Sequence, residues 1–286
     1  MVQLYRHTGK AYIIGITGSP GAGKSTLTDR LTHHIRKAGL TVGIIAVDPS
    51  SPFTGGAILG DRVRMSEHNL DEDVYIRSMA TRGFLGGMSK ATGDVVRVLD
   101  AFGKDIIIVE TVGVGQDEVD IIGIADTTCL VLVPGLGDAI QSMKAGIMEI
   151  ADIFTINKAD RAGADQLSAE VAYRVNQDAT IKPSDWSPLI VKTVAVSDEG
   201  VDQLWQAIGE HRKHLENGGR LQEKRRERTY RETLRMIHNE LFRVVREQLQ
   251  TTGQLDHLVE DILDHKNDPY TIMRQIVNKW LSISKK

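Results

Sequence analysis

A glycine-rich segment near the amino terminus has the residue types and spacing needed to hold the phosphates of a nucleotide. Residues 18–25 match the pattern G-x-x-x-x-G-K-[ST], with an apolar run before them and helical apolar spacing after them. Glycines let main-chain N–H groups turn inward around phosphate oxygens, and the following helix N-terminus adds partial positive charge. In such loops the lysine reaches the β- and γ-phosphates, and the hydroxyl after it ligates Mg²⁺. The residues predicted to bind the nucleotide are Gly18, Ser19, Pro20, Gly21, Ala22, Gly23, Lys24, Ser25 and Thr26.

A second motif predicts which base the nucleotide carries. Residues 157–160 read Asn-Lys-Ala-Asp and follow a short apolar run. The Asp160 carboxylate can accept hydrogen bonds from guanine N1–H and from its exocyclic amine, whereas adenine would leave that carboxylate unpaired. We expect Asn157 to support the loop and the N7 edge, and the stem of Lys158 to pack on the ring. The sequence therefore favours GTP and GDP over adenine nucleotides.

A looser match suggests a second loop around the base. Residues 193–197 follow the next apolar run and resemble the segment whose backbone contacts the base oxygen. Ala195 and Val196 are the predicted contacts. An ordinary strand-to-helix turn fits the same residues equally well.

Acidic residues at the ends of two apolar runs are candidates for the Mg²⁺ site. Asp48 and Glu110 each end such a run, and Asp61 lies in the loop that follows Asp48. Carboxylates beside a phosphate loop hold Mg²⁺ directly or through its waters. A helix N-cap or a solvated loop end is the alternative for all three.

Glycine-rich stretches between these residues are typical of segments that change conformation around a γ-phosphate. Gly113 is placed to offer its N–H to that phosphate, and Gln116 either orients the attacking water or is a plain loop residue. No arginine stands out as a finger supplied by the chain itself, so we expect slow turnover until a partner completes the site. The arginines considered were Arg62, Arg64, Arg77 and Arg82.

Short apolar runs alternate with segments of helical periodicity over the first three quarters of the chain. The runs are apolar throughout, as parallel strands buried on both faces are. This alternation predicts an α/β fold with a doubly wound, mostly parallel sheet and a ligand at the carboxyl ends of its strands. The predicted strands are residues 11–17, 41–47, 105–110, 127–134, 153–156 and 189–193; the predicted helices are residues 24–38, 90–102, 141–150, 163–178 and 200–214.

The remainder of the chain reads as helical. A break at residues 217–219 divides a predicted nucleotide-binding domain, residues 1–216, from an all-helical arm, residues 217–286. Apolar residues from Tyr230 to Leu249 recur at helical spacing and form either an intrachain core or a dimer surface, which we favour. The charged run 220–228 and the pair His211 and His214 are interpreted as solvated helix faces.

Composition excludes several classes of protein. The net charge of −3 argues against a nucleic-acid partner, and no apolar run reaches the ~18 residues that span a membrane. The single cysteine, Cys129, lies in an apolar run, so neither an intrachain disulfide nor a multi-cysteine zinc site can form. The expected location is the cytoplasm, and the expected role of Cys129 is a small buried hydrophobe.

These motifs resemble the MeaB/ArgK family, within the SIMIBI class of P-loop GTPases. The likeness extends from about residue 12 to the C-terminus and is carried by GITGSPGAGKST, VDPSSPFTGGAILGDR, RSMATRGFLGGMS, ETVGVGQDE, VLVPGLGDAIQSMKAGIMEIAD and NKAD. The resemblance implies a GTPase chaperone of a cobalamin-dependent acyl-CoA mutase, typically methylmalonyl-CoA mutase, which gates adenosylcobalamin loading and protects the mutase. It also implies a homodimer built through the helical arm. Carried over by motif, the resemblance implies that Lys24, Ser25, Asp48, Asp61 and Glu110 form the catalytic and Mg²⁺ set. Family members often carry a longer helical segment before the first strand.

The resemblance adds a further switch after VLVPGLG that couples the family to its mutase. Asp138, Gln141 and Lys144 fall in that segment, where surface positions at a helix start are the alternative. Three other functions share the same motifs: a metallochaperone GTPase, a phosphotransferase of the kind labelled amino-acid transport kinase, and a module that only binds nucleotide. The presence of only one cysteine weighs against a metallochaperone. The complete phosphate and Mg²⁺ set weighs against a module that only binds nucleotide.

Overall fold

The computed structural model describes residues 1–48, 68, 70–80, 90–111, 121–135, 148, 151–181 and 186–283. The chain divides into two compact units, Met1–Arg225 and Arg226–Lys286. The predicted boundary after residue 216 falls at the short turn η5 (Asn217–Gly219). It stays a prediction, because the helix that follows η5 contributes residues to both units.

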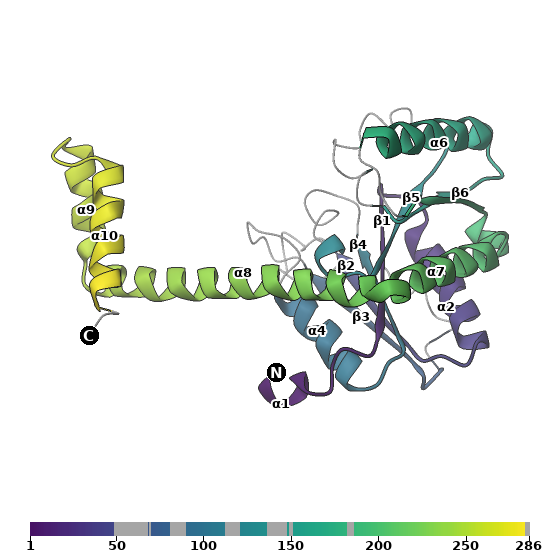
Figure 1. The fold of residues 1–286 in the computed structure, drawn as a ribbon, viewed down its shortest axis with the longest axis horizontal. Helices are drawn as coiled ribbons and strands as arrows, with labels where there is room; N and C mark the ends of the chain where they lie inside the picture. The colour runs from purple at the N-terminus through teal and green to yellow at the C-terminus, as the bar shows by residue number, and fades with distance from the viewer. Residues whose placement is uncertain are drawn as a thin grey trace. The chain divides into compact units, whose positions relative to one another are not determined.

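The described part of the first unit contains a seven-stranded sheet whose neighbouring strands all run parallel (Figure 1). The strand order is β3-β2-β4-β1-β5-β6-β7. From β1 the chain runs outward to β2 and β3, returns to insert β4 between β2 and β1, and continues on the other side of β1 through β5, β6 and β7. This confirms the predicted doubly wound, parallel fold. The strands are β1 (Tyr12–Gly18), β2 (Val42–Asp48), β3 (Val74–Ala80), β4 (Ile106–Thr111), β5 (Thr127–Leu132), β6 (Ile153–Asn157) and β7 (Leu189–Thr193).

The edge strand β3 is absent from the sequence prediction. It pairs with β2 in register from Val42 opposite Val74 to Asp48 opposite Ala80. Its side chains alternate, with Ile76 buried between exposed neighbours, because an edge strand needs only one apolar face. Continuous apolar runs identify the central strands, but an edge strand with an alternating pattern has no such run.

Helices cover both faces of the sheet. Among the described residues, α2 and α7 pack on one face, while α4 and α6 pack on the other (Figure 1). The bounds in this unit are α1 (Val2–Tyr5), α2 (Lys24–Lys37), α4 (Lys90–Ala101), η2 (Ile121–Gly123), α6 (Ala164–Ile181), η4 (Ala195–Ser197) and α7 (Val201–Glu216). The helix predicted at 141–150 lies outside the described residues.

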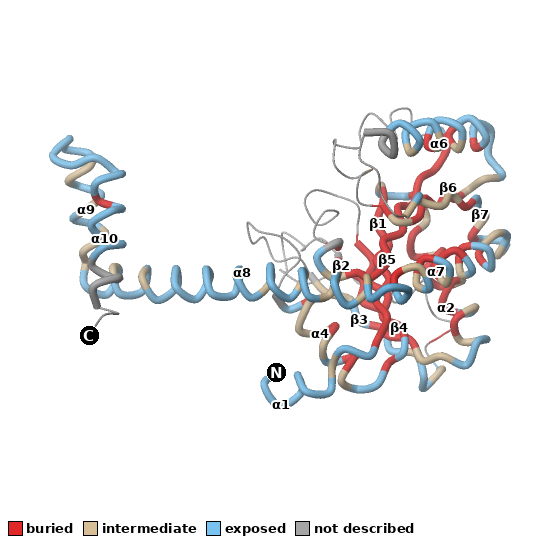
Figure 2. The backbone as a smooth tube through the Cα atoms, in the orientation of Figure 1, coloured by how far each residue is buried: buried red, intermediate tan, exposed pale blue. Residues whose placement is uncertain are grey.

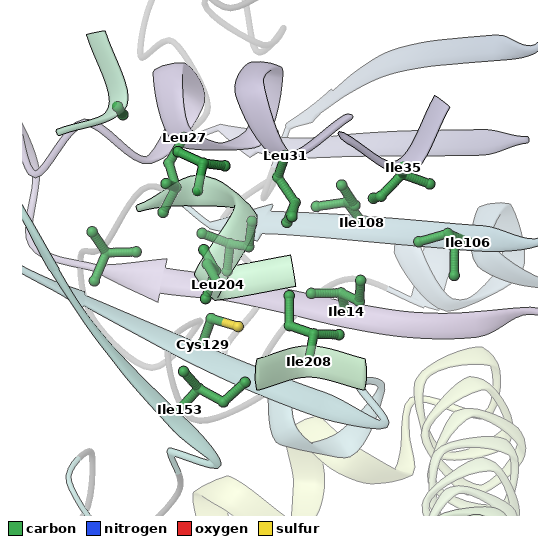
Figure 3. Close-up of a cluster of buried hydrophobic side chains, with 14 of the residues drawn as sticks. Ile14, Leu27, Leu31, Ile35, Ile106, Ile108, Cys129, Ile153, Leu204 and Ile208 are labelled. Carbon is green, nitrogen blue, oxygen red and sulfur yellow. The ribbon is translucent and has the colours of Figure 1, made fainter. Parts of the chain in front are cut away.

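Burial on both faces explains why the central strands are apolar at every position. Leu27 and Leu31 of α2 meet Ile14 and Ile108 in the core on one face, where Cys129 is also buried as predicted (Figure 3). On the opposite face Leu99 of α4 packs so closely that a Cβ at Gly43 would lie 2.8 Å from it. Figure 2 shows the strands as the most deeply buried part of this unit. Each fully buried aliphatic side chain contributes about 1.5–3 kcal/mol, which holds the strand ends in place.

Buried polar side chains form a network at the amino ends of β1, β5 and β6. The Thr127 hydroxyl lies 2.5 Å from the Tyr12 hydroxyl and 2.8 Å from His211 Nδ1, and His211 Nε2 lies 3.4 Å from the Asp152 carboxylate. The order Thr-His-Asp is that of a nucleophile triad. Thr127 is completely buried, however, so a substrate cannot reach it and the arrangement is structural.

The interpretation of His211 as part of a solvated helix face is wrong. Only 1% of His211 is exposed, because α7 lies against the start of β5 and Trp186 packs on the imidazole. Burial lowers the pKa of His211 to about 4, outweighing the attraction of Asp152. The imidazole is therefore neutral in the folded protein near pH 7.

The charged run 220–228 is also not wholly a solvated exterior. Arg225 donates to the Asp126 carboxylate at 2.6 Å and to the Gly9 carbonyl at 2.8 Å, and Lys224 donates to the Asp126 carbonyl at 2.7 Å. The Asp126 side chain is completely buried. A buried carboxylate needs a cationic or hydrogen-bonding partner, so this part of the run is held against the amino ends of the strands.

The second unit is helical, as predicted. It contains the greater part of α8 (Arg220–Thr251), α9 (Gln254–Leu263) and α10 (Pro269–Ile283). Asp268 caps α10: its carboxylate accepts hydrogen bonds from the Thr271 hydroxyl and from the N–H groups of Thr271 and Tyr270, which lower the pKa of the carboxyl. No residue of α8 is buried within this chain. None of the described helices has the length and apolarity needed to cross a bilayer.

Candidate nucleotide-binding site

The carboxyl ends of the central strands bring the predicted motifs to one edge of the sheet. β1 lies between β4 and β5, and the chain winds in opposite directions on its two sides. Ligands bind at such a switch point in doubly wound sheets. Gly18, Thr111, Asn157 and Thr193 are the last residues of β1, β4, β6 and β7. The phosphate motif, one predicted Mg²⁺ carboxylate and both base loops therefore start from the same edge.

Glycines of the phosphate loop serve two different needs. Gly18, Gly21 and Gly23 all have positive φ, at 140°, 76° and 87°. A Cβ at Gly18 would lie 2.2 Å from the Val131 carbonyl oxygen, and one at Gly23 would lie 2.5 Å from Asn157 Nδ2. At Gly21 no atom lies within 4 Å of a built Cβ. Two glycines thus permit close packing, and the third gives the loop its shape over open space.

The lysine of the loop is folded onto the loop itself. Lys24 Nζ donates to the carbonyl oxygens of Gly18 at 2.7 Å and of Ser19 at 3.0 Å, and the residue is 6% exposed. Gly23 caps the N-terminus of α2 directly before it. A positive side chain and a helix N-terminus at one loop create a site suited to an anion.

The hydroxyl predicted to ligate Mg²⁺ contacts one of the predicted carboxylates. Ser25 Oγ donates to Glu110 Oε1 at 2.7 Å, and Glu110 is 4% exposed. Thr28 Oγ1 donates to the other carboxylate oxygen, Oε2, at 2.8 Å. Hydroxyl and carboxylate oxygens are hard donors of the kind Mg²⁺ prefers, so this pair fits the ion. In the described part of the chain, no group of three or more His, Cys, Asp or Glu side chains forms a separate metal site.

Other predicted catalytic residues lie outside what the structure describes. Asp48 ends β2 beside the same edge, but only its backbone is described. Predictions at further positions fall on residues without a description: Asp61, Arg62, Arg64, Arg82, Gly113, Gln116, Asp138, Gln141 and Lys144. Arg77 lies on β3 opposite Ile45, with an exposed side chain.

Asn157 joins three loops of the site. Its Nδ2 donates to the Ala22 carbonyl at 2.8 Å, and its Oδ1 accepts from the Thr193 hydroxyl at 3.2 Å and from the Ala195 N–H at 3.1 Å. The residue is 2% exposed. The side chain therefore braces the phosphate loop against the second base loop, which agrees with its expected support of the loop. Its contact with the N7 edge stays a prediction.

Lys158 and Asp160, which follow Asn157 in the same motif, have different surroundings. Lys158 has a positive φ of 57°, and its Nζ donates to the Gly21 carbonyl at 2.8 Å. Asp160 is exposed, in a turn where Arg161 N–H donates to the Lys158 carbonyl. The Asp160 carboxylate therefore reaches solvent at this edge, and its contact with a guanine base stays a prediction.

The second base loop is a braced turn. η4 is closed by an antiparallel bridge between Val194 and Glu199, and His34 Nε2 of α2 lies 3.0 Å from the carboxylate of Asp198. Ala195 is buried, whereas Val196 is 78% exposed. The Asn157 contact to Ala195 N–H links this turn to the first base motif. The contacts of Ala195 and Val196 with a base stay predictions.

Thr28 is a site residue that the sequence reasoning did not identify. It follows Ser25 by one turn of α2, which places both hydroxyls on one face of the helix. A threonine in a buried amphipathic helix is usually assigned to packing. The spacing of Ser25 and Thr28 indicates a shared helical face, but only the packing of α2 on β4 shows that this face meets Glu110.

Comparisons with known proteins agree with this geometry. A family model described as "Methylmalonyl Co-A mutase-associated GTPase MeaB" matches residues 1–250. A Pyrococcus abyssi protein that carries a GTPase name is 50% identical over 286 residues, which cover 98% of this chain and 88% of the relative. The mouse protein "Methylmalonic aciduria type A homolog, mitochondrial" is 36% identical over 233 residues, or 78% of this chain and 55% of the relative.

A solved structure has the same fold over nearly the whole chain. The crystal structure of a protein named "LAO/AO transport system kinase" superposes with a TM-score of 0.71 at 26% identity. The match covers 98% of this chain and 85% of the solved chain. The likeness therefore includes residues of both compact units.

Proposed function

The chain belongs to the MeaB/ArgK family of P-loop GTPases, and on that basis we propose that it hydrolyses GTP with Mg²⁺ as the chaperone of a cobalamin-dependent acyl-CoA mutase. The proposed products are GDP and phosphate. In this role, hydrolysis gates the loading of adenosylcobalamin and protects the mutase. Methylmalonyl-CoA mutase is the proposed client.

The observation that carries the GTPase proposal is the brace formed by Asn157. One side-chain amide connects the phosphate loop at Ala22 with the second base loop at Ala195. A ligand that bears phosphates at one end and a purine at the other would contact all of these loops together. The exposed Asp160 then supplies the acceptor that distinguishes guanine from adenine.

Residues of this chain would supply most of the phosphate chemistry. Ser25 and Glu110 would hold Mg²⁺, together with Asp48 and Asp61 by the family motif, and the ion would neutralise charge that develops on the phosphates. Lys24 would exchange its two loop carbonyls for phosphate oxygens. The N–H of Gly113 would meet the γ-phosphate. These roles describe positioning and charge stabilisation, which supply most of the catalysis in phosphoryl transfer.

The mutase partner is proposed from the family and from one relative of this chain. The matching family model is described as mutase-associated, and the mouse relative is named for methylmalonic aciduria. Asp138, Gln141 and Lys144 are the proposed coupling residues. Intrinsic hydrolysis would be slow and stimulated when the mutase completes the site.

A homodimer through the helical arm is proposed from the exposed apolar side chains of α8. Tyr230, Leu234, Ile237 and Leu241 are each at least half exposed, at 65%, 50%, 51% and 61%, and recur at helical spacing. An apolar stripe of this kind normally meets a second surface. Leu241→Asp should convert the dimer to a monomer in sedimentation analysis, while the exposed Glu240→Gln should leave it dimeric. A wild-type monomer at micromolar concentration would contradict the dimer.

The function is tested by hydrolysis assays with and without a purified cobalamin-dependent mutase. We expect phosphate release from GTP, faster turnover when the mutase is present, and no comparable release from ATP. Methylmalonyl-CoA mutase should be compared with an unrelated acyl-CoA enzyme as control. Equal rates in all mixtures would contradict the chaperone role, and a preference for ATP would contradict the base assignment.

A phosphotransferase is the second candidate, because the solved structure with the same fold belongs to a protein named a transport system kinase. A kinase would move the γ-phosphate to an acceptor instead of water. Incubation with γ-labelled GTP and candidate acceptors separates the two functions. We expect the label in inorganic phosphate; label in a phosphoprotein or small-molecule ester would favour the kinase.

A further inference from the structure

We propose that Thr28 is a positioning residue that fixes the Glu110 carboxylate for Mg²⁺ and leaves the Ser25 hydroxyl able to bind the ion. The inference rests on the proposed function, because it assigns a role within the same Mg²⁺ and nucleotide site. Thr28 lies outside the residues that the sequence motifs assign to that site.

The geometry at Glu110 is that of a two-point clamp. Ser25 Oγ donates to Oε1 at 2.7 Å, and Thr28 Oγ1 donates to Oε2 at 2.8 Å. Both distances are those of strong O–H···O⁻ hydrogen bonds. Thr28 is completely buried, so its hydroxyl is shielded from water that could take the place of this contact. Each carboxylate oxygen is thus held by a hydroxyl from α2.

The fold brings these groups together from two elements. Ser25 and Thr28 are three residues apart on α2, hence on the same helical face. Glu110 lies on β4 opposite Ile16 of β1 and Ala46 of β2, within the middle of the sheet. The same face of the sheet carries the core that receives Leu27 and Leu31 of α2. Packing of that core therefore fixes how closely both hydroxyls approach the carboxylate.

Two donors give the carboxylate an orientation that one donor cannot. A carboxylate held at a single oxygen can rotate about its terminal torsion, which is broad in side chains of this type. A hydroxyl has one proton and two acceptor lone pairs. Ser25 can donate its proton to Glu110 and still offer a lone pair to a cation. With Thr28 fixing the second oxygen, Ser25 does not have to orient the carboxylate alone.

Partners that orient the groups around a metal typically change its affinity by about 10–100-fold when removed. Thr28 is expected to act through Glu110 and not through the phosphates, since its hydroxyl is bonded to the carboxylate. Its loss should therefore weaken the response to Mg²⁺ and leave Mg²⁺-free nucleotide binding unchanged. A general effect on helix packing would change both.

The chain provides a matched control on the same helix. Thr32 is also completely buried, but its hydroxyl donates to the main-chain carbonyl of Thr28 at 2.7 Å. Thr32→Val and Thr28→Val make the same chemical change one helical turn apart. Only Thr28→Val removes a hydrogen-bond donor from Glu110.

The test measures binding of a fluorescent GDP analogue to the full-length protein in EDTA and over a range of Mg²⁺ concentrations. Thr28→Val should raise the Mg²⁺ concentration for half-maximal tightening about tenfold, with affinity in EDTA unchanged. Thr28→Ser keeps the hydroxyl and should stay within about twofold of the wild type. Thr32→Val should match the wild type. Thr28→Ala replaces Thr28→Val, under the same criteria, if the valine variant does not fold.

The outcomes separate this inference from the proposed function. A wild-type protein that binds no GDP in either condition would overturn the GTPase proposal and the Thr28 role with it. A normal wild-type response with an unchanged Mg²⁺ requirement in Thr28→Val would overturn the Thr28 role alone. Equal shifts in Thr28→Val and Thr32→Val, or loss of the response in Thr28→Ser, would also overturn it.

Discussion

The two ends of the same strands use buried polar side chains in opposite ways. At the amino ends, polar groups satisfy one another: Asp126 pairs with Arg225, and Thr127 bonds to His211. At the carboxyl ends, side chains hold the main-chain carbonyls of a glycine loop, as Lys24 does with Gly18. A closed network stabilises the fold. Hydrogen bonds from a side chain to the carbonyls of a phosphate loop can be exchanged for contacts to a ligand.

The elements that cover each end explain this difference. The amino ends are covered by α7 and by the first turns of α8, which bring His211 and Arg225 onto buried groups. The carboxyl ends carry loops instead. Asp160, which is expected to recognise the base, lies at that edge with an exposed carboxylate. The comparison predicts that changes at the amino ends lower stability, whereas changes at the carboxyl ends lower function.

Removal of Arg225 should have the largest effect. Arg225→Ala leaves the Asp126 carboxylate buried without the guanidinium, which costs about 3–5 kcal/mol of unfolding free energy. Urea unfolding measures the loss, and GDP affinity of the folded variant should stay within about twofold of the wild type. Lys192→Ala, in an exposed pair with Asp165, is the control with little effect. A loss of GDP affinity as large as the loss of stability would show that the two ends are not separable.

Removal of Lys24 should have the next largest effect, on function. Lys24→Ala deletes the ammonium at the phosphate loop and should reduce GTP hydrolysis by about 10²-fold or more. The loss of unfolding free energy should be smaller than for Arg225→Ala, because Lys24 donates to neutral main-chain carbonyls, whereas Arg225→Ala leaves a buried carboxylate without its guanidinium. Single-turnover phosphate release measures the rate. The exposed Lys37→Ala on the same helix should retain full activity, and undiminished hydrolysis by Lys24→Ala would contradict the site.

A smaller and more selective change is expected at Asp160. Asp160→Asn exchanges an acceptor for a donor, so preference should move from GTP toward XTP by about 10–100-fold. Competition between the two nucleotides measures this preference. Asp165→Asn, an exposed change at the start of α6, should leave the preference as it is. An unaltered preference for GTP in Asp160→Asn would refute its role with the base.

The smallest effect concerns pH and the buried imidazole. Burial lowers the folded-state pKa of His211 to about 4. Lys224 and His214 lower this pKa further, whereas Asp152 raises it. The unfolded imidazole titrates near pH 6.5, so the unfolded chain binds more protons between about pH 6.5 and 4. The stability contribution of the neutral imidazole is present above pH 6.5 and declines as the pH falls through this range.

His211→Gln should remove that part of the pH dependence. Unfolding free energies measured in urea at pH 7.5, 6 and 5 should decline less steeply for the variant than for the wild type. The exposed His33→Gln should keep the wild-type decline. Parallel curves for the wild type and His211→Gln would show that His211 does not carry the effect.

The sequence motifs identified the nucleotide edge more fully than the opposite edge. The loop at residues 18–25 and the motif at 157–160 have fixed spacings, because phosphates and a base impose them on any chain of this kind. Ser25 and Glu110 were both predicted, and the structure brings them together. Thr28 was missed because its contact depends on how α2 packs on β4, and no local spacing records that packing.

The amino-end network was misread for a related reason. His211 and Arg225 look like members of a solvated helix face when only their own helices are considered. Their partners, Thr127 and Asp126, lie 84 and 99 positions away along the chain. Only the closed fold decides that these polar groups become buried together. The edge strand β3 was missed because half-burial leaves an alternating pattern instead of a continuous apolar run.

The sequence by itself determined the parallel sheet, the phosphate loop and the predicted guanine motif, since each is encoded by neighbouring residues. The tertiary structure decided which distant groups meet: Asn157 with the phosphate loop, Thr28 with Glu110, and Arg225 with Asp126. The physical reason is that a hydrogen bond or ion pair inside the protein depends on packing between elements. Periodicity and motif spacing describe one element at a time.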